Sequence, residues 1–236
     1  MKILSRKTLA PFDWFLILGV IIADTAYMLL AGDFDIMGFL ACTTGVFCVV
    51  LCAKRSIANY VFGVINVSLY AFISYKSRIY GDAVLNAFYY FPMQFIGFYL
   101  WIRHKGGADS EGRKDDSIVK ASRMSFAQRI MLALFSLFSI LAAGWILSKY
   151  TSDPQPYKDS ATTVLSVIAM YLMVRTYMEQ WALWIIVNLI SIAMWVFVWL
   201  RGDPHSALMA IMYIFYLINS INGMRLWNRA LRRAAV

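Results

Sequence analysis

The chain has 236 residues, of which 61% are hydrophobic, 16% aromatic and only 15% charged. This balance is too apolar for a soluble domain of that size, so we predict an all-α integral membrane protein in a lipid bilayer. The net charge of +9 lies in the stretches between apolar runs, which argues against a nucleic-acid-binding face.

Eight apolar runs follow one another along the chain, and crossing the hydrocarbon core takes roughly 20 residues of helix. The predicted spans are 12–31, 36–53, 57–75, 83–102, 130–147, 160–174, 181–200 and 206–227. The first run has no small-residue cleavage site behind it, which favours a retained helix over a signal peptide. The polar stretch from His104 to Ser122 is rich in Gly, Ser and mixed charge, and predicts a flexible linker.

The distribution of Lys and Arg predicts the orientation. With eight spans, 17 of these residues fall on the side of both termini and 5 on the other side. Cytoplasmic loops collect Lys and Arg, so both termini and the linker are predicted to be cytoplasmic.

The sequence contains an internal repeat. VFGVINVSLYAF (Val61–Phe72) aligns with LWIIVNLISIAM (Leu183–Met194), which places Asn66 on Asn188. Two more pairs follow in the same order: YGD at 80–82 with RGD at 201–203, and GFYLW at 97–101 with GMRLW at 223–227. The offsets of 122, 121 and 126 residues span four helices. Both copies therefore cross the membrane in the same direction.

This parallel repeat predicts the organisation of the chain. The expected parts are an extra N-terminal helix (1–32), a first three-helix bundle (33–103), a cytoplasmic linker (104–129), an inverting helix (130–150), a second three-helix bundle (151–228) and a basic tail (229–236). A 3+1+3 arrangement about an axis along the membrane normal is one way to build a transporter, with the substrate at the repeat interface.

Trp181, Trp184 and Asn188 share one helix face, and Asn188 lies roughly 10 Å deeper than Trp181. Four further amides occupy corresponding deep positions; they are Asn66, Gln94, Asn219 and Asn222. Indoles combined with amides suit a flat, neutral polar ligand or a pyridinium-like cation. We predict these seven residues to bind substrate. The structural alternatives are helix-to-helix hydrogen bonds for the amides and an interfacial belt for the tryptophans.

Other chemistry is poorly represented. We find no Walker A sequence, no metal-ligand spacing, and no nucleophile with an acid and base, so neither a cofactor, a metal nor an enzyme is predicted. Cys42, Cys48 and Cys52 fit small buried residues. Ion-coupled carriers usually hold central carboxylates. Here only Asp24, outside the repeat, and Glu179, at a span end, are candidates, which favours a passive carrier and leaves proton binding at Asp24 as the alternative.

The W-x-x-W-x-x-x-N motif at Trp181, Trp184 and Asn188 resembles the PnuC family of bacterial vitamin transporters. NYVFGVINVSLYAF (Asn59–Phe72), GFYLW and NGMRLW (Asn222–Trp227) resemble its other recurrent segments. The likeness runs from about residue 51 to 228, and the extra first span departs from family members with seven helices.

The resemblance implies facilitated diffusion of nicotinamide riboside across the bacterial inner membrane. Net uptake would depend on a cytoplasmic kinase that traps the product and need not touch the carrier. The implied fold is the SWEET-like 3+1+3 plan, and the sequence leaves room for a homo-oligomer. Relatives carrying thiamine or riboflavin leave those vitamins as alternatives.

Overall fold

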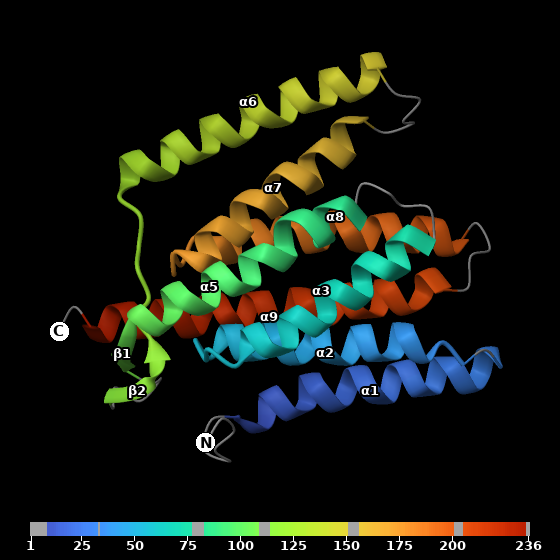
Figure 1. Ribbon diagram of the computed structural model, residues 1–236, viewed down its shortest axis with the longest axis horizontal. Coiled ribbons are helices and arrows are strands. Elements are labelled where there is room, and N and C mark those ends of the chain that lie inside the picture. Colours follow the sequence, from blue (N-terminus) through green and yellow to red (C-terminus); the bar gives the residue numbers. More distant parts are fainter. Residues whose placement is uncertain are drawn as a thin grey trace.

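The computed structural model describes residues 9–32, 34–76, 83–108, 114–150, 156–200 and 205–234, whose helices run side by side (Figure 1). The elements are α1 (Pro11–Ala31), α2 (Ile36–Ala53), α3 (Asn59–Lys76), η1 (Leu85–Tyr90), α5 (Phe91–Arg103), β1 (Lys105–Ala108), β2 (Lys114–Val119), α6 (Phe126–Tyr150), α7 (Pro156–Val174), α8 (Gln180–Leu200) and α9 (His205–Ala234). This almost entirely helical chain agrees with the predicted all-α class. The α6 and α9 helices each extend several residues beyond the predicted spans.

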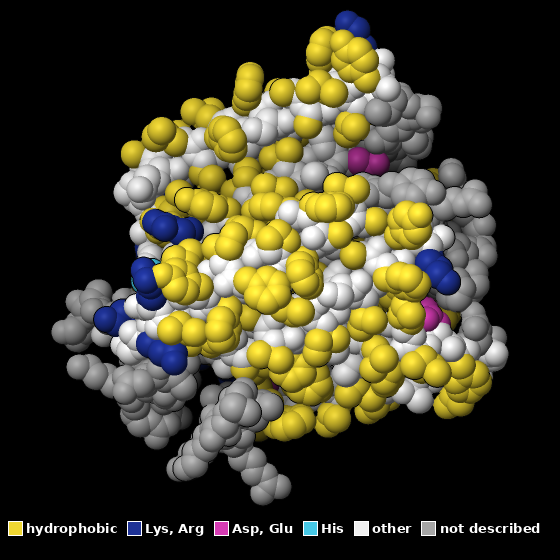
Figure 2. Space-filling model, in the orientation of Figure 1, with side chains coloured by type: hydrophobic (Ala, Val, Ile, Leu, Met, Phe, Trp, Pro, Cys, Tyr) yellow, Lys and Arg dark blue, Asp and Glu magenta, His cyan; other side chains and the backbone are white. Residues whose placement is uncertain are grey.

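Among the described helices, α1, α2, α6, α8 and α9 are each long and apolar enough to cross a membrane. Hydrophobic side chains cover the face drawn in Figure 2, while Lys and Arg side chains gather at the end of the molecule where the hairpin lies. An apolar belt with charges at its end is the surface that a bilayer requires. The α3, α5 and α7 helices are less apolar or shorter, and each buries polar residues, among them Asn59, Gln94 and Ser166.

The first helix is fixed at both ends by local chemistry. Pro11 supplies a preset φ at the first turn, and the Asp13 carboxylate accepts a hydrogen bond of 2.6 Å from the Ala10 N–H. Asp13 also pairs with the Lys54 ammonium at 2.7 Å, which ties the start of α1 to the end of α2. At the other end, Gly32 has a φ of 68°, the left-handed geometry that stops a helix.

For description we divide the central helices into two sets. We call α2, α3 and the continuous helix η1–α5 the first bundle, and α7, α8 and α9 the second bundle. The third helix of each bundle packs against the first helix of the other, α5 on α7 and α9 on α2. The α1 helix lies at one edge against α2 and α9, and α6 lies at the opposite edge against α7 (Figure 1).

The two bundles end their first helices in the same way. Arg55 follows α2 with a φ of 59°, and Thr176 follows α7 with a φ of 60°. In both turns the next N–H reaches back five residues, from Ser56 to Leu51 at 3.0 Å and from Tyr177 to Leu172 at 2.9 Å. Left-handed geometry at a residue other than Gly costs roughly 1–3 kcal/mol, so the rest of the structure must hold both turns.

The GxxLW segments of the repeat also have matching surroundings. A Cβ added to Gly97 would lie 2.4 Å from the Tyr60 ring, and one added to Gly223 would lie 2.6 Å from the Trp181 ring. Each glycine is needed because an aromatic ring rests on the backbone there. The YGD and RGD segments at 80–82 and 201–203 lie outside the described residues.

The tryptophans that end these segments connect the bundles. Trp101 donates from its indole nitrogen to the Met173 carbonyl at 3.0 Å, and Trp227 donates to the Ala53 carbonyl at 3.2 Å. Each indole therefore bonds to the last turn of the first helix in the other bundle. Both tryptophans are fully buried.

The prediction of a flexible linker between His104 and Ser122 is wrong for its described part. Strands β1 and β2 pair as an antiparallel hairpin, with Lys105 opposite Val119. Ile118 and Val119 are buried. The Gly- and charge-rich composition suggested mobility, but the β-branched residues at 118 and 119 supply the apolar contacts that anchor the segment. Residues 109–113 lie outside the described part.

A π-helix interrupts the fourth predicted span. The Phe91 N–H bonds to the Asn86 carbonyl, five residues back, and Pro92 follows directly. Because Pro92 has no N–H and its ring crowds the preceding turn, a wider turn is favoured there. The Tyr89 hydroxyl donates to the Val167 carbonyl at 2.8 Å and so docks η1 on α7.

Candidate functional site

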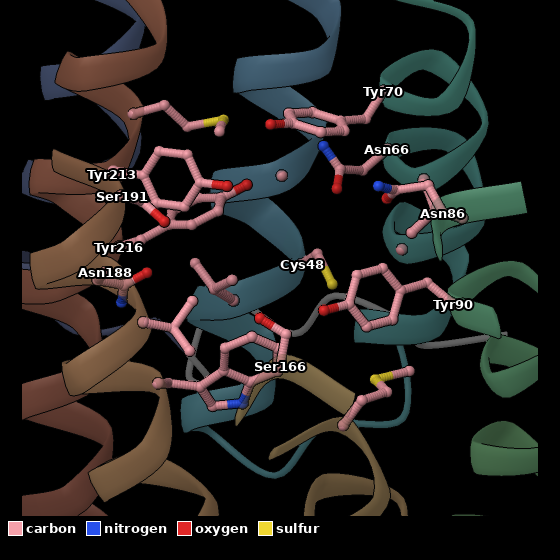
Figure 3. Close-up of a pocket in the computed structure, with 18 of the residues that line it drawn as sticks. Cys48, Asn66, Tyr70, Asn86, Tyr90, Ser166, Asn188, Ser191, Tyr213 and Tyr216 are labelled. Atoms are coloured by element: carbon pink, nitrogen blue, oxygen red, sulfur yellow. The ribbon is translucent and has the colours of Figure 1, made fainter. Parts of the chain in front are cut away.

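A cavity of about 200 Å³ lies between the two bundles. Every helix of both bundles contributes to its wall, whereas α1 and α6 do not. Figure 3 shows Asn66, Asn86 and Tyr90 on one side and Asn188 and Tyr216 on the other, all pointing toward the space between them. The cavity therefore lies where the repeat predicted a substrate site.

The lining is polar and aromatic without charge. Amides, hydroxyls, sulfur atoms and aromatic rings make up most of the wall; these side chains include Cys48, Asn66, Tyr70, Asn86, Tyr90, Gln94, Ser166, Trp181, Trp184, Asn188, Ser191, Trp195, Tyr213, Tyr216 and Ser220. Among the described residues that line the cavity, none is an Asp, Glu, Lys, Arg or His. A ligand held here would be recognised by hydrogen bonds and ring contacts.

Five of the seven predicted site residues line this cavity. Trp181, Trp184 and Asn188 come from α8, Asn66 from α3 and Gln94 from α5. The structure thus brings the aligned pair Asn66 and Asn188 to one space from opposite bundles.

The two aligned asparagines are held by different partners. The Asn66 amide nitrogen donates to the Ala41 carbonyl on α2 at 2.8 Å. The Asn188 amide nitrogen donates to the Ser220 hydroxyl on α9 at 3.0 Å, and that hydroxyl donates to the Tyr216 carbonyl at 2.8 Å. Because each bond uses an amide hydrogen, the orientation of each amide is fixed before any ligand arrives.

Asn219 and Asn222 are not among the cavity-lining residues. The cavity-lining face of α9 carries Tyr216 and Ser220, four residues apart. Asn219 is one position before Ser220, so its side chain is turned by about 100°, and it donates to the Val49 carbonyl of α2 at 2.8 Å. Its contact is the helix-to-helix hydrogen bond that the sequence left open as an alternative.

Two polar atoms of the lining residues lack a partner in the described part of the chain. The Gln94 side-chain oxygen and the Trp181 indole N–H are both buried without a hydrogen bond. A buried acceptor or donor left unpaired costs roughly 1–3 kcal/mol. Because both atoms are fully buried, a ligand would recover this free energy only after these side chains shift toward the cavity.

Glycines let the polar groups approach the helix backbones. A Cβ on Gly63 would lie 2.2 Å from the Gln94 oxygen, so the amide rests directly over this glycine. A Cβ on Gly45 would meet the Tyr216 hydroxyl and lie 2.8 Å from the Asn66 amide nitrogen. The Tyr216 and Asn66 polar groups therefore meet at α2.

Several lining residues were not predicted from the sequence. Asn86 and Tyr90 come from the π-helix, Ser166 from α7, and Tyr213 from α9. For Asn86 a signal was available, because a buried amide stands six residues before Pro92 in an apolar run. For the others, the sequence gives no information about which face of a helix meets the opposite bundle.

The two carboxylates considered for ion coupling lie away from the cavity wall. Asp24 is buried on α1 beside the Cys42 thiol. Glu179 accepts hydrogen bonds from the Met124 N–H at 3.2 Å and pairs with Arg129 at 2.9 Å. Glu179 thus fixes the chain at the start of α6 to the start of α8.

Comparison with known proteins places the chain in a family. A family profile described as nicotinamide mononucleotide transporter matches residues 35–229. The chain is 35% identical over 195 residues to the nicotinamide riboside transporter PnuC of Neisseria mucosa, covering 82% of this chain and 72% of that protein. It is 28% identical over 221 residues to PnuC of Escherichia coli K12, covering 86% and 90%.

A solved structure is similar over almost the whole length. It is described as the crystal structure of the vitamin B3 transporter PnuC, with a TM-score of 0.82 and 32% sequence identity, and covers 95% of this chain and 94% of that one. The apolar helices and the cavity with an uncharged lining among the described residues, together with these likenesses, define a multi-pass membrane transporter of a small molecule. The chain belongs to the PnuC family.

Proposed function

We propose that this protein carries nicotinamide riboside across the bacterial inner membrane by facilitated diffusion. The observation that carries the proposal is a cavity between two repeat-related bundles whose described lining is aromatic and amide-rich and contains no charged side chain. The relatives named above are nicotinamide riboside transporters, and the same substrate suits this cavity.

The uncharged wall favours the nucleoside over its phosphate. The matching family description names the mononucleotide, which adds a phosphate carrying about −1.5 to −2 charges near neutral pH. Burying such a group without a cationic partner is strongly unfavourable. None of the described lining residues offers one, so we expect the mononucleotide to be rejected.

The nicotinamide ring and the ribose of nicotinamide riboside match the aromatic and the amide side chains of the cavity wall. The Trp181 and Trp184 indoles can stack on a flat ring, and their faces attract the positive charge of a pyridinium. A carboxamide would donate to the Gln94 oxygen and accept from the Trp181 N–H after a small shift of these buried side chains, which both lack a partner among the described residues. The Asn66 and Asn188 amides then remain for ribose hydroxyls.

We infer the SWEET-like 3+1+3 organisation for residues 33–228, with α1 outside the repeat and α6 as the inverting helix. The matching turns at Arg55 and Thr176 and the reciprocal bonds of Trp101 and Trp227 support an axis between the bundles. The bias of Lys and Arg supports cytoplasmic termini, on the same side as the hairpin.

Transport would proceed by rocking of one bundle against the other around the cavity. Neither Asp24 nor Glu179 lines the cavity, which supports movement of the substrate without a coupled ion. Net uptake would then depend on phosphorylation of the substrate by a cytoplasmic kinase.

Calorimetry on the purified protein tests the proposed substrate. Nicotinamide riboside should bind, and nicotinamide mononucleotide, thiamine and riboflavin should bind at least tenfold more weakly, a difference of about 1.4 kcal/mol. Tighter binding of thiamine or riboflavin would reassign the substrate. Equal binding of the mononucleotide would contradict the argument from the uncharged wall.

A further inference from the structure

A short segment, from the end of β2 into the connection to α6, joins the two bundles at one end of the cavity. We call residues Ile118–Ser122 the strap. The Val119 N–H donates to the Arg55 carbonyl at 3.2 Å, and the Ser122 N–H donates to the Thr176 carbonyl at 2.8 Å. These acceptors are the two repeat-related residues with positive φ. One strap therefore holds the corresponding turn of each bundle.

Each attachment has a second bond. The Arg55 guanidinium is buried and donates from Nη1 to the Val119 carbonyl at 3.1 Å. The Met178 N–H donates to the Ser122 carbonyl at 2.9 Å. Three residues of extended chain reach about 10 Å at most, so the strap fixes how far apart the two turns can move.

Beneath the strap lies a row of aromatic rings that we call the aromatic floor: Tyr60, Trp101, Trp227 and Trp181. Neighbouring ring centroids are 5.1, 6.4 and 5.9 Å apart along this row. The first two rings belong to the first bundle and the last two to the second bundle. Val119 is 1% exposed and packs into the same cluster.

The aromatic floor separates the strap from the cavity. Trp181, Cys52 and Met173 belong to the cluster that contains the floor, and they also line the cavity. Any exit toward the strap must part the rings of the two bundles. That movement breaks the reciprocal indole bonds of Trp101 and Trp227 and draws the two turns apart.

We propose that the strap is the latch of the gate on the hairpin side of the cavity. While Val119 and Ser122 hold both turns, the aromatic floor stays closed. Release of either attachment frees one bundle to move and opens the cavity toward the hairpin side. The two turns keep a left-handed Arg and a left-handed Thr in place of Gly, and the strap bonds are among the contacts that hold this locally unfavourable geometry.

This inference rests on the proposed transport function for its biological meaning, but native thiols test it independently of any substrate. Cys48 and Cys52 line the cavity, while Cys42 does not. In a Cys42→Ser background, an impermeant thiol reagent is added from the hairpin side of membrane vesicles.

Ser122→Pro removes the N–H that bonds to Thr176. Lys120→Pro is the matched control, because the Lys120 N–H bonds to the His104 carbonyl at 3.0 Å, outside both turns.

Loss of one hydrogen bond should speed labelling of Cys48 and Cys52 in Ser122→Pro by roughly two- to tenfold, with Lys120→Pro unchanged. Val119→Ala should also speed labelling, because it shrinks the side chain that fills the floor. If Ser122→Pro does not fold, Val119→Ala alone decides. Unchanged labelling in folded variants overturns the latch even if nicotinamide riboside binds. Faster labelling without binding of nicotinamide riboside keeps the latch and rejects the proposed substrate.

Discussion

The two bundles share a framework but present different walls to the cavity. In the first bundle the Tyr60 ring packs on Gly97, and in the second bundle the Trp181 ring packs on Gly223. Each bundle also has a Trp whose indole donates a hydrogen bond to the other bundle. Inside the cavity the two walls differ: the first bundle contributes Gly63 and Gln94, whereas the second bundle contributes Trp184 and Ser220.

This difference indicates how a repeat protein can bind an asymmetric ligand. The first bundle leaves a gap at Gly63 and places the Gln94 amide over it. The second bundle contributes the Trp184 indole and the small Ser220 to its wall. At these positions the first bundle offers a hydrogen-bonding amide and the second bundle offers a ring face, while the framework outside the cavity keeps its symmetry.

The largest expected effect comes from the framework glycines. Gly97→Ala and Gly223→Ala should each destabilise the protein by about 3 kcal/mol, because a buried ring must move. Thermal unfolding in detergent measures this loss. Only Gly223→Ala should also weaken substrate binding by calorimetry, since Trp181 lines the cavity and Tyr60 does not. If Gly97→Ala and Gly223→Ala weakened substrate binding equally, the two bundles would not differ in their contributions to binding.

The second-largest effect is expected from removal of the Trp184 ring. Trp184→Ala should weaken binding of nicotinamide riboside by about 2 kcal/mol, the size of one base–aromatic stack. Calorimetry gives the dissociation constant directly. Trp145→Ala on α6 is the control, because Trp145 is half exposed and away from the cavity. An unchanged constant for Trp184→Ala would return this tryptophan to a membrane-interface role.

The hydrogen-bonding wall should contribute less. Gln94→Ala should weaken binding by about 1 kcal/mol, the net value of one hydrogen bond. Gly63→Ala should do the same without removing the amide, because its Cβ would displace the Gln94 oxygen. If the two variants differ in binding affinity by more than tenfold, the contact between Gly63 and Gln94 is not what positions the amide.

The smallest effect concerns the two strained turns. Thr176→Gly should stabilise the protein by about 0.5–1 kcal/mol, because relief of left-handed strain exceeds the added entropy of the unfolded chain. Thr176 also has a buried hydroxyl without a partner in the described chain. Arg55→Gly should stabilise less or destabilise, since it removes the bond to Val119. Thermal unfolding compares them, and a larger gain from Arg55→Gly would contradict this reading.

The helices were predictable because the length of each apolar run and the polar residues between the runs determine where the helices begin and end. Positions on the cavity wall were predictable where depth and repeat coincided, as for Asn66 and Asn188. Depth alone could not separate Asn219 from Ser220, because a rotation of about 100° decides which helix face meets the cavity. The hairpin, the π-turn before Pro92 and the strap depend on contacts between distant segments. Their composition gave no sign of those contacts.

Counterflow in liposomes tests the central claim most directly. Vesicles loaded with unlabelled nicotinamide riboside, without a pH or sodium gradient and without ATP, are placed in labelled substrate. The account predicts transient accumulation of label inside, and the same accumulation in Asp24→Asn, because the carrier exchanges substrate without a coupled ion. Exchange that appears only under an imposed gradient, and is lost in Asp24→Asn, would contradict the passive mechanism.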